Sequence, residues 1–180
     1  AAVSRTPVAL ISFVDSDRQW FKAKHGWTIS GTSREVAICA HTIVSDDHLV
    51  IEDTAAHDRF RGHPLVVDDP RIRFYAGVPL RVVRDGVTDG RPASAVGTLC
   101  VLDVEPHSFG ESDLAALQTL AHQVERLLEA RLRAAEHQRL QTAKAALRER
   151  FNVITESMLC GVVVHRRDGA IESANRAAER

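Results

Sequence analysis

Cysteine is scarce in this chain, and its three cysteines suit neither a disulfide framework nor a zinc site. Cys39, Cys100 and Cys160 are odd in number and widely spaced, and no two of them form a Cys-x-x-Cys pair. Structural zinc sites usually take their ligands from such closely spaced pairs. The pattern therefore predicts reduced thiols and a cytoplasmic location.

The sequence also lacks long apolar runs and an excess of charge of one sign. It lacks the common nucleotide-binding and zinc-binding motifs as well. No apolar run approaches the roughly 20 residues of a membrane helix, and no signal peptide opens the chain. The net charge is −1, which gives no support for a nucleic-acid or anionic-membrane partner. The sequence contains no GxGxxG, P-loop or HExxH motif. We expect neither partner, and the sequence requires no cofactor.

The chain does have enough apolar residues for a core, and they centre on one predicted hairpin. Its 180 residues are 44% hydrophobic, which suffices for one full domain and part of another. Residues 72–83 and 95–102 are apolar runs rich in Val, Leu, Phe and Tyr, and Asp85-Gly86 lies between them. Asp-Gly between two such runs is typical of a β-hairpin. Because both runs are nearly continuous in hydrophobicity, we expect central strands buried on both faces.

Three residues inside these strands predict local irregularity. Gly77 and Gly97 indicate a bulge or the close approach of another group. Pro79 removes one donor of the hydrogen-bond ladder, so one side of its strand should be irregular or free at that point.

The segments before this hairpin alternate between predicted strands and helical turns. A capping box formed by Thr32 and Glu35 is expected to start the first helix, whose Val36, Ile38 and Cys39 begin an apolar stripe. The predicted elements are a hairpin of strands 8–14 and 19–24, a helix over 34–44, a strand over 49–53 and a short helical turn over 56–62.

A long helix is predicted after the hairpin, because residues 111–160 contain neither Pro nor Gly. At about 1.5 Å per residue it could reach roughly 70 Å. Its apolar stripe is wide at first, as on a helix that covers a sheet, and then narrows to a seam for one partner helix. We expect a parallel homodimer that passes a signal along this helix; the alternative is a frayed tail. The dimer residues are Leu132, Leu140, Leu147, Phe151 and Ile154.

The residues after the helix predict a second, smaller hairpin. Residues 161–165 and 170–172 read as strands around the Asp168-Gly169 turn. A hairpin of this size cannot fold alone, and the chain begins and ends in the middle of a pattern. We therefore expect it to be a piece of a longer protein.

Two known families match these segments in order and spacing. PVALISFVDSDRQWFKAKHGW, REVAICAHTIVSDDHLVIEDTAAHDRF, PRIRFYAGVPL and VGTLCVLDVEP, followed by LQTLAHQVERLLEAR, resemble a GAF domain of bacterial sensor proteins. FNVITESMLCGVVVHRRDGAIESANRAAER resembles the start of a PAS domain. The domains expected from this resemblance are a GAF domain over 1–131, a signalling coiled-coil helix over 132–158 and a truncated PAS start over 159–180.

The GAF resemblance implies an α+β fold. A central antiparallel β-sheet of about five or six strands would be flanked by helices, with a long C-terminal coiled-coil helix. It also implies a small-molecule pocket on one face, a dimer formed by terminal helices, and a downstream output domain such as a histidine kinase, diguanylate cyclase or phosphatase. The candidate pocket residues are Cys39, Ile43, Phe60, Arg73, Phe74, Tyr75 and Leu99.

Other chemistries were weighed at these residues. Cys39 and His41 are two apart on a helix and so point to different sides, which disfavours a shared metal. A bilin-binding Cys-His pair would fall beyond the third strand, where no Cys occurs, and the cyclic-nucleotide signature of the family is missing. Haem ligation by His41, His57 or His63 stays open. Arg73 either holds an anionic ligand or pairs with Asp53 or Asp58 as structural support, and we favour the second.

The function expected from the resemblance is a non-catalytic sensory and regulatory module. It would bind an unidentified small molecule, dimerise, or do both, and would act on an output domain of the parent chain. One alternative is a pure dimerisation scaffold whose pocket is filled in. Another is a reductase of oxidised methionine that uses Cys39 and Cys100, although no third cysteine of that class is present in the domain.

Overall fold

The computed structural model describes residues 5–45, 47–82 and 94–179 of the chain. The chain divides into two compact units, residues 1–130 and 131–180. The turn expected around Asp85-Gly86 lies outside the described residues. Within the described residues, no helix is long and apolar enough to cross a membrane.

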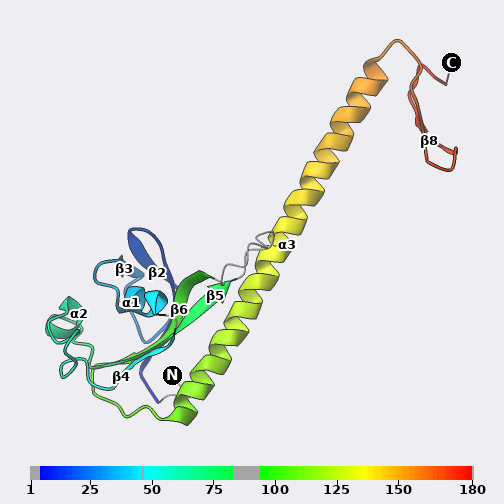
Figure 1. The fold of residues 1–180 in the computed structure, drawn as a ribbon. Coiled ribbons are helices and arrows are strands. Elements are labelled where there is room, and N and C mark those ends of the chain that lie inside the picture. The colour runs from blue at the N-terminus through cyan, green and yellow to red at the C-terminus, as the bar shows by residue number, and fades with distance from the viewer. Residues whose placement is uncertain (1–4, 46, 83–93, 180) are drawn as a thin grey trace. The chain divides into compact units, whose positions relative to one another are not determined.

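The first unit is built on a six-stranded antiparallel sheet (Figure 1). Its strand order is β3-β2-β1-β6-β5-β4, so the strands nearest the middle come from the two ends of the unit's sequence. This confirms the expected α+β fold. The strands are β1 (Val8–Val14), β2 (Arg18–His25), β3 (Gly31–Ser33), β4 (Leu49–Ile51), β5 (Phe74–Val82) and β6 (Ser94–Asp103).

The predicted central hairpin is confirmed by the pairing of β5 with β6. Eight of the nine residues of β5 are buried, as expected for a strand covered on both faces. At Gly97, an added Cβ would lie 1.9 Å from the carbonyl oxygen of Ser12 on β1, so only glycine permits this approach of two strands. Pro79 also behaves as expected, since the β4 pairing stops at Gly77 and a register shift follows between Leu80 and Arg81.

The first helix is shorter than predicted. Helix α1 (Ile38–Val44) begins four residues later than expected, at an N-cap residue, Ala37, that makes no side-chain capping bond. The predicted capping box is wrong because Thr32 belongs to β3 and pairs with Gln19 of β2. Pairing at the edge of the sheet therefore outcompetes the local helix signal in this segment.

Two further elements differ from the prediction in extent. Strand β4 ends at Ile51 rather than at residue 53. The segment after it forms turns and then a short helix, α2 (Pro64–Val67), which the sequence did not predict. His63 caps α2 by accepting a hydrogen bond at Nδ1 from the Leu65 backbone N–H, at 3.3 Å.

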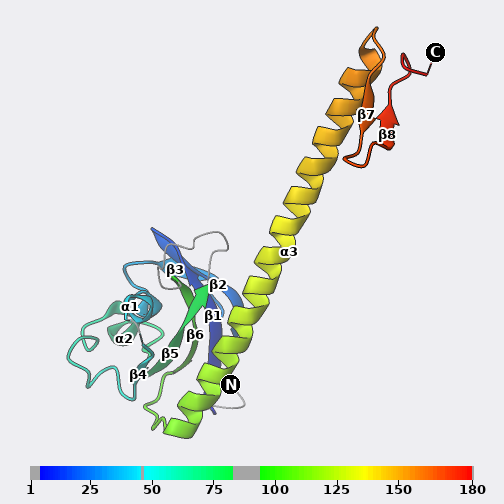
Figure 2. The ribbon, with the colours of Figure 1, turned by 45° about the vertical axis from the view of Figure 1, so that its right-hand side comes forward.

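The two faces of the sheet carry separate apolar clusters. The start of helix α3 (Glu111–Ser157) lies against one face, where its Leu117 and Ala121 are buried (Figure 2). Helix α1 and the segment around α2 cover the other face. The α3-side cluster is Phe74, Ala76, Val78, Leu80, Leu99, Val101, Leu117 and Ala121. The α1-side cluster is Val8, Leu10, Ile38, Cys39, Ile51, Phe60, Ile72, Tyr75, Cys100 and Leu102.

Helix α3 confirms the predicted long helix. It has 47 residues, or about 70 Å of helix, and ends three residues before the predicted end. In the single chain, between 47% and 69% of the surface of each predicted seam residue is exposed. The values are Leu132 53%, Leu140 61%, Leu147 69%, Phe151 50% and Ile154 47%.

The second unit contains the predicted small hairpin, β7 (Val163–His165) with β8 (Ile171–Ala174). Asn175, only 3% exposed, ties it to the preceding residues. Its side-chain amide donates to the carbonyl oxygens of Thr155 and Cys160, and its Oδ1 accepts from the backbone N–H of Val162. Each polar atom of this buried amide is therefore used.

Candidate functional site

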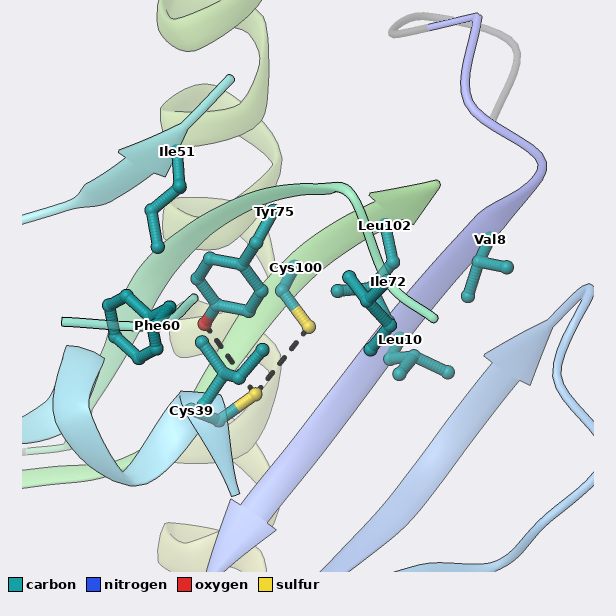
Figure 3. Packing of buried hydrophobic residues seen from close by; sticks show 10 residues of the cluster. Val8, Leu10, Cys39, Ile51, Phe60, Ile72, Tyr75, Cys100 and Leu102 are labelled. Atoms are coloured by element: carbon teal, nitrogen blue, oxygen red, sulfur yellow. Dashed lines mark hydrogen bonds between the residues drawn. The ribbon is translucent and has the colours of Figure 1, made fainter. Parts of the chain in front are cut away.

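The α1 face of the sheet carries the candidate site. Ile38, Cys39 and Thr42 are the buried residues of α1, and their spacing of one and three places them on one side of the helix. That side faces Tyr75 of β5 and Cys100 of β6, as Figure 3 shows for Cys39. The site therefore lies where one short helix covers the two long strands.

A continuous set of hydroxyl and thiol contacts runs through this layer. The Tyr75 hydroxyl donates to Cys39 Sγ at 3.5 Å and lies 2.7 Å from Thr42 Oγ1. Cys39 Sγ lies 3.7 Å from Cys100 Sγ (Figure 3). These polar groups are buried, so the mutual contacts offset part of the cost of removing them from water.

Tyr75 depends on a glycine two residues along its own strand. An added Cβ at Gly77 would lie 2.3 Å from the Tyr75 hydroxyl oxygen and under 3 Å from its ring. The ring therefore lies over the Gly77 backbone, which brings the hydroxyl toward α1. This explains the glycine that the sequence marked as a site of close approach.

The two thiols have opposite pKa shifts. The hydrogen bond from Cys100 lowers the pKa of Cys39, although burial opposes this effect. The same contact and burial raise the pKa of Cys100. When one thiol loses its proton, the other thiol can donate a hydrogen bond to the resulting thiolate and so stabilise it. Removing the second proton is then harder, because it would place two negative charges side by side, and this explains why the two pKa shifts have opposite signs. Burial also raises the pKa of Tyr75, so its hydroxyl stays protonated and remains a donor.

A small cavity adjoins the thiol pair. Its volume is about 20 Å³, which is room for one water molecule rather than for a metabolite. Its lining includes Cys39 of α1 and Tyr75 of β5, together with residues of strands β1 and β2. The complete lining is Leu10, Gln19, Phe21, Trp27, Thr32, Ile38, Cys39, Leu65, Ile72, Tyr75 and Leu102.

Two residues that line the cavity each have a buried polar atom without a hydrogen-bond partner among the described residues. These atoms are the indole Nε1 of Trp27 and the hydroxyl Oγ1 of Thr32. An unpaired buried donor costs about 1–3 kcal/mol, so such atoms are usually satisfied by water or by a ligand. Trp27 and Thr32 therefore contribute an unsatisfied indole N–H and an unsatisfied hydroxyl to the residues that line the cavity.

A second group of side chains surrounds Phe60 at the edge of the same layer. The rings of His41, His57 and His63 lie 5.4, 5.2 and 6.0 Å from the Phe60 ring. Arg59 Nη2 donates to His41 Nδ1 at 2.9 Å, and burial together with this cation lowers the pKa of His41. Among the described residues, no three His, Cys, Asp or Glu side chains are arranged to hold a metal ion.

Arg73 pairs with Asp53, as favoured from the sequence. Its Nε and Nη2 reach the two carboxylate oxygens of Asp53 at 2.9 and 2.7 Å. This bidentate contact lowers the pKa of Asp53 and occupies the guanidinium edge that an anionic ligand would need. Asp58, the other partner considered, contacts Arg61 instead.

The structure does not bring the predicted pocket residues together in one place. Cys39 and Tyr75 line the cavity, and Phe60 belongs to the same apolar cluster without lining it. Ile43 lies on α1 and is half-buried. Phe74 and Leu99 lie on the opposite face of the sheet, in the cluster under α3. Whether any of these residues contacts a ligand stays a prediction.

Gln19, Trp27 and Thr32 line the cavity but were not identified from the sequence. Strand alternation could have placed Gln19 and Phe21 on one face, because they are two apart on β2. No sequence signal placed Trp27 or Thr32 at the cavity. Trp27 lies between β2 and β3, and the place of Thr32 depends on β3 pairing at the sheet edge.

Comparison with known proteins supports this fold. Residues 1–128 match the family model described as GAF domain. A cyclic di-GMP phosphodiesterase of Pseudomonas aeruginosa is 40% identical over 121 residues. That match covers 67% of this chain and only 19% of the relative, so the chain spans about a fifth of the longer protein.

Solved structures share the architecture at low sequence identity. A domain assigned to a two-component sensor histidine kinase protein of Sinorhizobium meliloti superposes with a TM-score of 0.54 at 19% identity, covering 77% of this chain and 88% of that one. A free methionine-R-sulfoxide reductase of Neisseria meningitidis, solved with its substrate, gives a TM-score of 0.54 at 21% identity, covering 72% and 71%. At these identities the likeness concerns the fold alone.

Proposed function

Because the chain belongs to the GAF domain family, we propose that it is a non-catalytic sensory module of a multidomain signalling protein. The observation that carries the proposal concerns two residues that line the cavity under α1. Trp27 and Thr32 each have a buried polar atom, Nε1 and Oγ1, without a hydrogen-bond partner among the described residues. A small ligand with a hydrogen-bond acceptor would satisfy the indole N–H and could also accept from the threonine hydroxyl.

Ligand entry requires the cavity to open. Its volume of about 20 Å³ is well below the roughly 300 Å³ of an ordinary ligand pocket. Trp27, Phe21 and Leu65 are only partly buried, so the outer wall of the cavity is the part that would move. The ligand would then favour the more open arrangement over the closed one, which is the differential affinity that any signal requires.

We further propose that helix α3 carries the signal as half of a parallel homodimer. Its exposed seam advances from Leu140 in steps of 3, 4, 4 and 3 residues, which suits one partner helix. The residues after Leu140 in this series are Ala143, Leu147, Phe151 and Ile154. Residues 132–158 would be the signalling helix, and 159–180 would be the start of a PAS domain. A change in how the two helices pack would couple the ligand to an output domain in the parent chain.

The output would be a signalling domain outside this chain. The candidate output domains from the sequence are a histidine kinase, a diguanylate cyclase and a phosphatase. The relative named a cyclic di-GMP phosphodiesterase adds a phosphodiesterase domain to these candidates. In this proposal the module contributes regulation and not catalysis. The buried thiols do not favour a methionine sulfoxide reductase, because Cys39 is 4% exposed and Cys100 is fully buried.

A dimerisation scaffold without a ligand is the second candidate, and the small cavity volume favours it. Native mass spectrometry of the purified chain, with a visible absorption spectrum of the same sample, distinguishes the two. Sensing predicts a dimer that carries an added small-molecule mass. A dimer without added mass supports the scaffold, and a visible band would identify haem or bilin.

The Trp27→Phe variant sharpens this experiment, because it removes the indole N–H and keeps an aromatic ring. If the ligand accepts from Trp27, the fraction of dimer carrying the added mass should fall about tenfold, the effect of one hydrogen bond of roughly 1.4 kcal/mol. Trp20→Phe is the matched control, since Trp20 is 38% exposed and does not line the cavity. Equal occupancy in both variants would contradict the assigned site.

A further inference from the structure

The buried thiol pair has a geometry that the sensory function does not use. Cys39 of α1 and Cys100 of β6 are 61 residues apart in sequence, yet their sulfur atoms are 3.7 Å apart. Among the described residues these two are the buried cysteines, and Cys160 is exposed. From the geometry we propose that Cys39 and Cys100 form a reversible intramolecular disulfide when a small peroxide reaches them.

The distance is compatible with a bond after a small movement. A disulfide holds its sulfur atoms about 2.05 Å apart, so the pair must close by about 1.7 Å. Cys39 lies near the start of a seven-residue helix that has no side-chain cap at its N-terminus. Cys100 lies in the middle of the sheet, paired on both sides. The closing movement therefore belongs to α1 and the Cys39 side chain.

The surroundings equip Cys39 to react first. The Tyr75 hydroxyl donates to Cys39 Sγ, and the Cys100 thiol contacts the same sulfur. Donors of this kind stabilise a thiolate, which is the form that attacks a peroxide. Consistent with this order, contact with Cys100 lowers the pKa of Cys39, while that of Cys100 is raised.

The chemistry proceeds in two balanced steps. The Cys39 thiolate attacks one peroxide oxygen, the O–O bond breaks, and the released hydroxide takes up a proton to leave as water. Cys39 then carries a sulfenic acid. The Cys100 sulfur attacks the Cys39 sulfur, and the sulfenic oxygen leaves as a second water with the Cys100 proton. Overall, two thiols lose two electrons to hydrogen peroxide, which is reduced to two waters.

The cavity selects the oxidant by size. Cys39 lines the water-sized cavity and Cys100 does not, so a molecule entering there meets Cys39 first. Hydrogen peroxide consists of two oxygen atoms, whereas a tripeptide disulfide such as oxidised glutathione is far larger than the space of about 20 Å³. Native protein should therefore react with peroxide and resist oxidised glutathione.

The test uses the full chain with Cys160→Ser, so that the exposed thiol forms no bond between chains. Native protein is treated with hydrogen peroxide and then unfolded in urea that contains N-ethylmaleimide, which alkylates every free thiol. Mass spectrometry then gives the mass of the intact chain and of its peptides. We expect two maleimide adducts before oxidation and none afterwards, a cross-linked peptide containing Cys39 and Cys100, and both adducts again after dithiothreitol. Two adducts after peroxide, or oxygen added to Cys39 without a cross-link, would overturn the proposal.

Two comparisons complete the design. Oxidised glutathione should leave both thiols of native protein reduced, so that both are alkylated after denaturation, and it should react with them only after urea unfolding. Equal rates with both oxidants would contradict entry through the cavity. In Cys100→Ala, peroxide should leave a sulfenic acid on Cys39 that dimedone traps, because the resolving thiol is gone. If this variant does not fold, the peptide map of the parent protein still decides.

Discussion

Gly97 is the residue whose replacement tests the central strand pairing most sharply. In Gly97→Ala the new Cβ would meet the Ser12 carbonyl oxygen at 1.9 Å and Phe13 Cα at 2.9 Å, and both are backbone atoms that cannot rotate away. We expect a loss of about 3 kcal/mol or more in the free energy of unfolding, at the upper end of overpacking costs. Urea denaturation followed by circular dichroism measures it.

Gly62→Ala is the matched control, because an added Cβ there has no neighbour within 4 Å. Its stability should change by no more than about 0.5 kcal/mol, or rise slightly through the unfolded chain. Similar losses in the two variants would show that strand contact is not what requires Gly97.

His63 gives the first unit a stability that depends on pH. Burial lowers the pKa of His63, so the folded state binds its proton less readily than the unfolded chain. The contribution of His63 to the free energy of unfolding is therefore fully present at pH values above about 6.5, the pKa of histidine in the unfolded chain. It decreases as the pH falls below that value toward the lower pKa of the folded state. Protonation also removes the Nδ1 acceptor that caps α2.

His63→Asn should flatten this pH dependence, because asparagine caps a helix at every pH. Urea midpoints at pH 7.5 and at pH 5.5 are the measurement, and the variant should lose less between them than the parent protein. His41, whose pKa is also lowered, keeps part of the dependence in both proteins. Equal losses would mean that the cap does not titrate.

Among the elements, α3 has two parts with separate roles. Leu117 is 4% exposed against the sheet, so Leu117→Ala should cost the first unit about 2–5 kcal/mol. Leu127 is 65% exposed, so Leu127→Ala should stay within about 0.5 kcal/mol. Urea denaturation at low protein concentration compares them. Equal costs would contradict the assignment of Leu117 to the core.

The elements also show what the sequence could predict. The long strands and α3 were predictable because their own apolar patterns agree with the fold. The start of α1 was not predictable, because Thr32 fits both a helix-capping pattern and a strand that pairs with the edge of β2. In the structure Thr32 pairs with β2. Helix α2 has only four residues, too few to show a helical period.

The candidate site was predictable only in part, for a similar reason. Cys39 was expected to face the core or the pocket because it lies on the apolar stripe of α1, and it belongs to the core cluster and lines the cavity. Its contact with Cys100 joins residues far apart in the chain, so no local pattern could reveal it. The cavity depends on how β2, β3 and α1 meet, which is a property of packing.

For the molecule as a whole, the proposed function makes the GAF unit the input and a pair of α3 helices its output. Leu117 and Ala121 near the start of α3 are buried and stabilise the first unit, whereas the seam residues farther along the helix are exposed. In this proposal the partner is a second copy of the chain, because one sequence supplies identical spacing on both helices.

Disulfide trapping across the seam tests whether two α3 helices pair in parallel. Leu140→Cys is made in a chain with Cys160→Ser and oxidised mildly, and Glu149→Cys, half a turn away around the helix axis, is the control. A parallel, in-register dimer predicts rapid cross-linking of Leu140→Cys into a covalent dimer, while Glu149→Cys stays monomeric on a denaturing gel. Slow or equal cross-linking of both variants would contradict signal transfer through paired α3 helices.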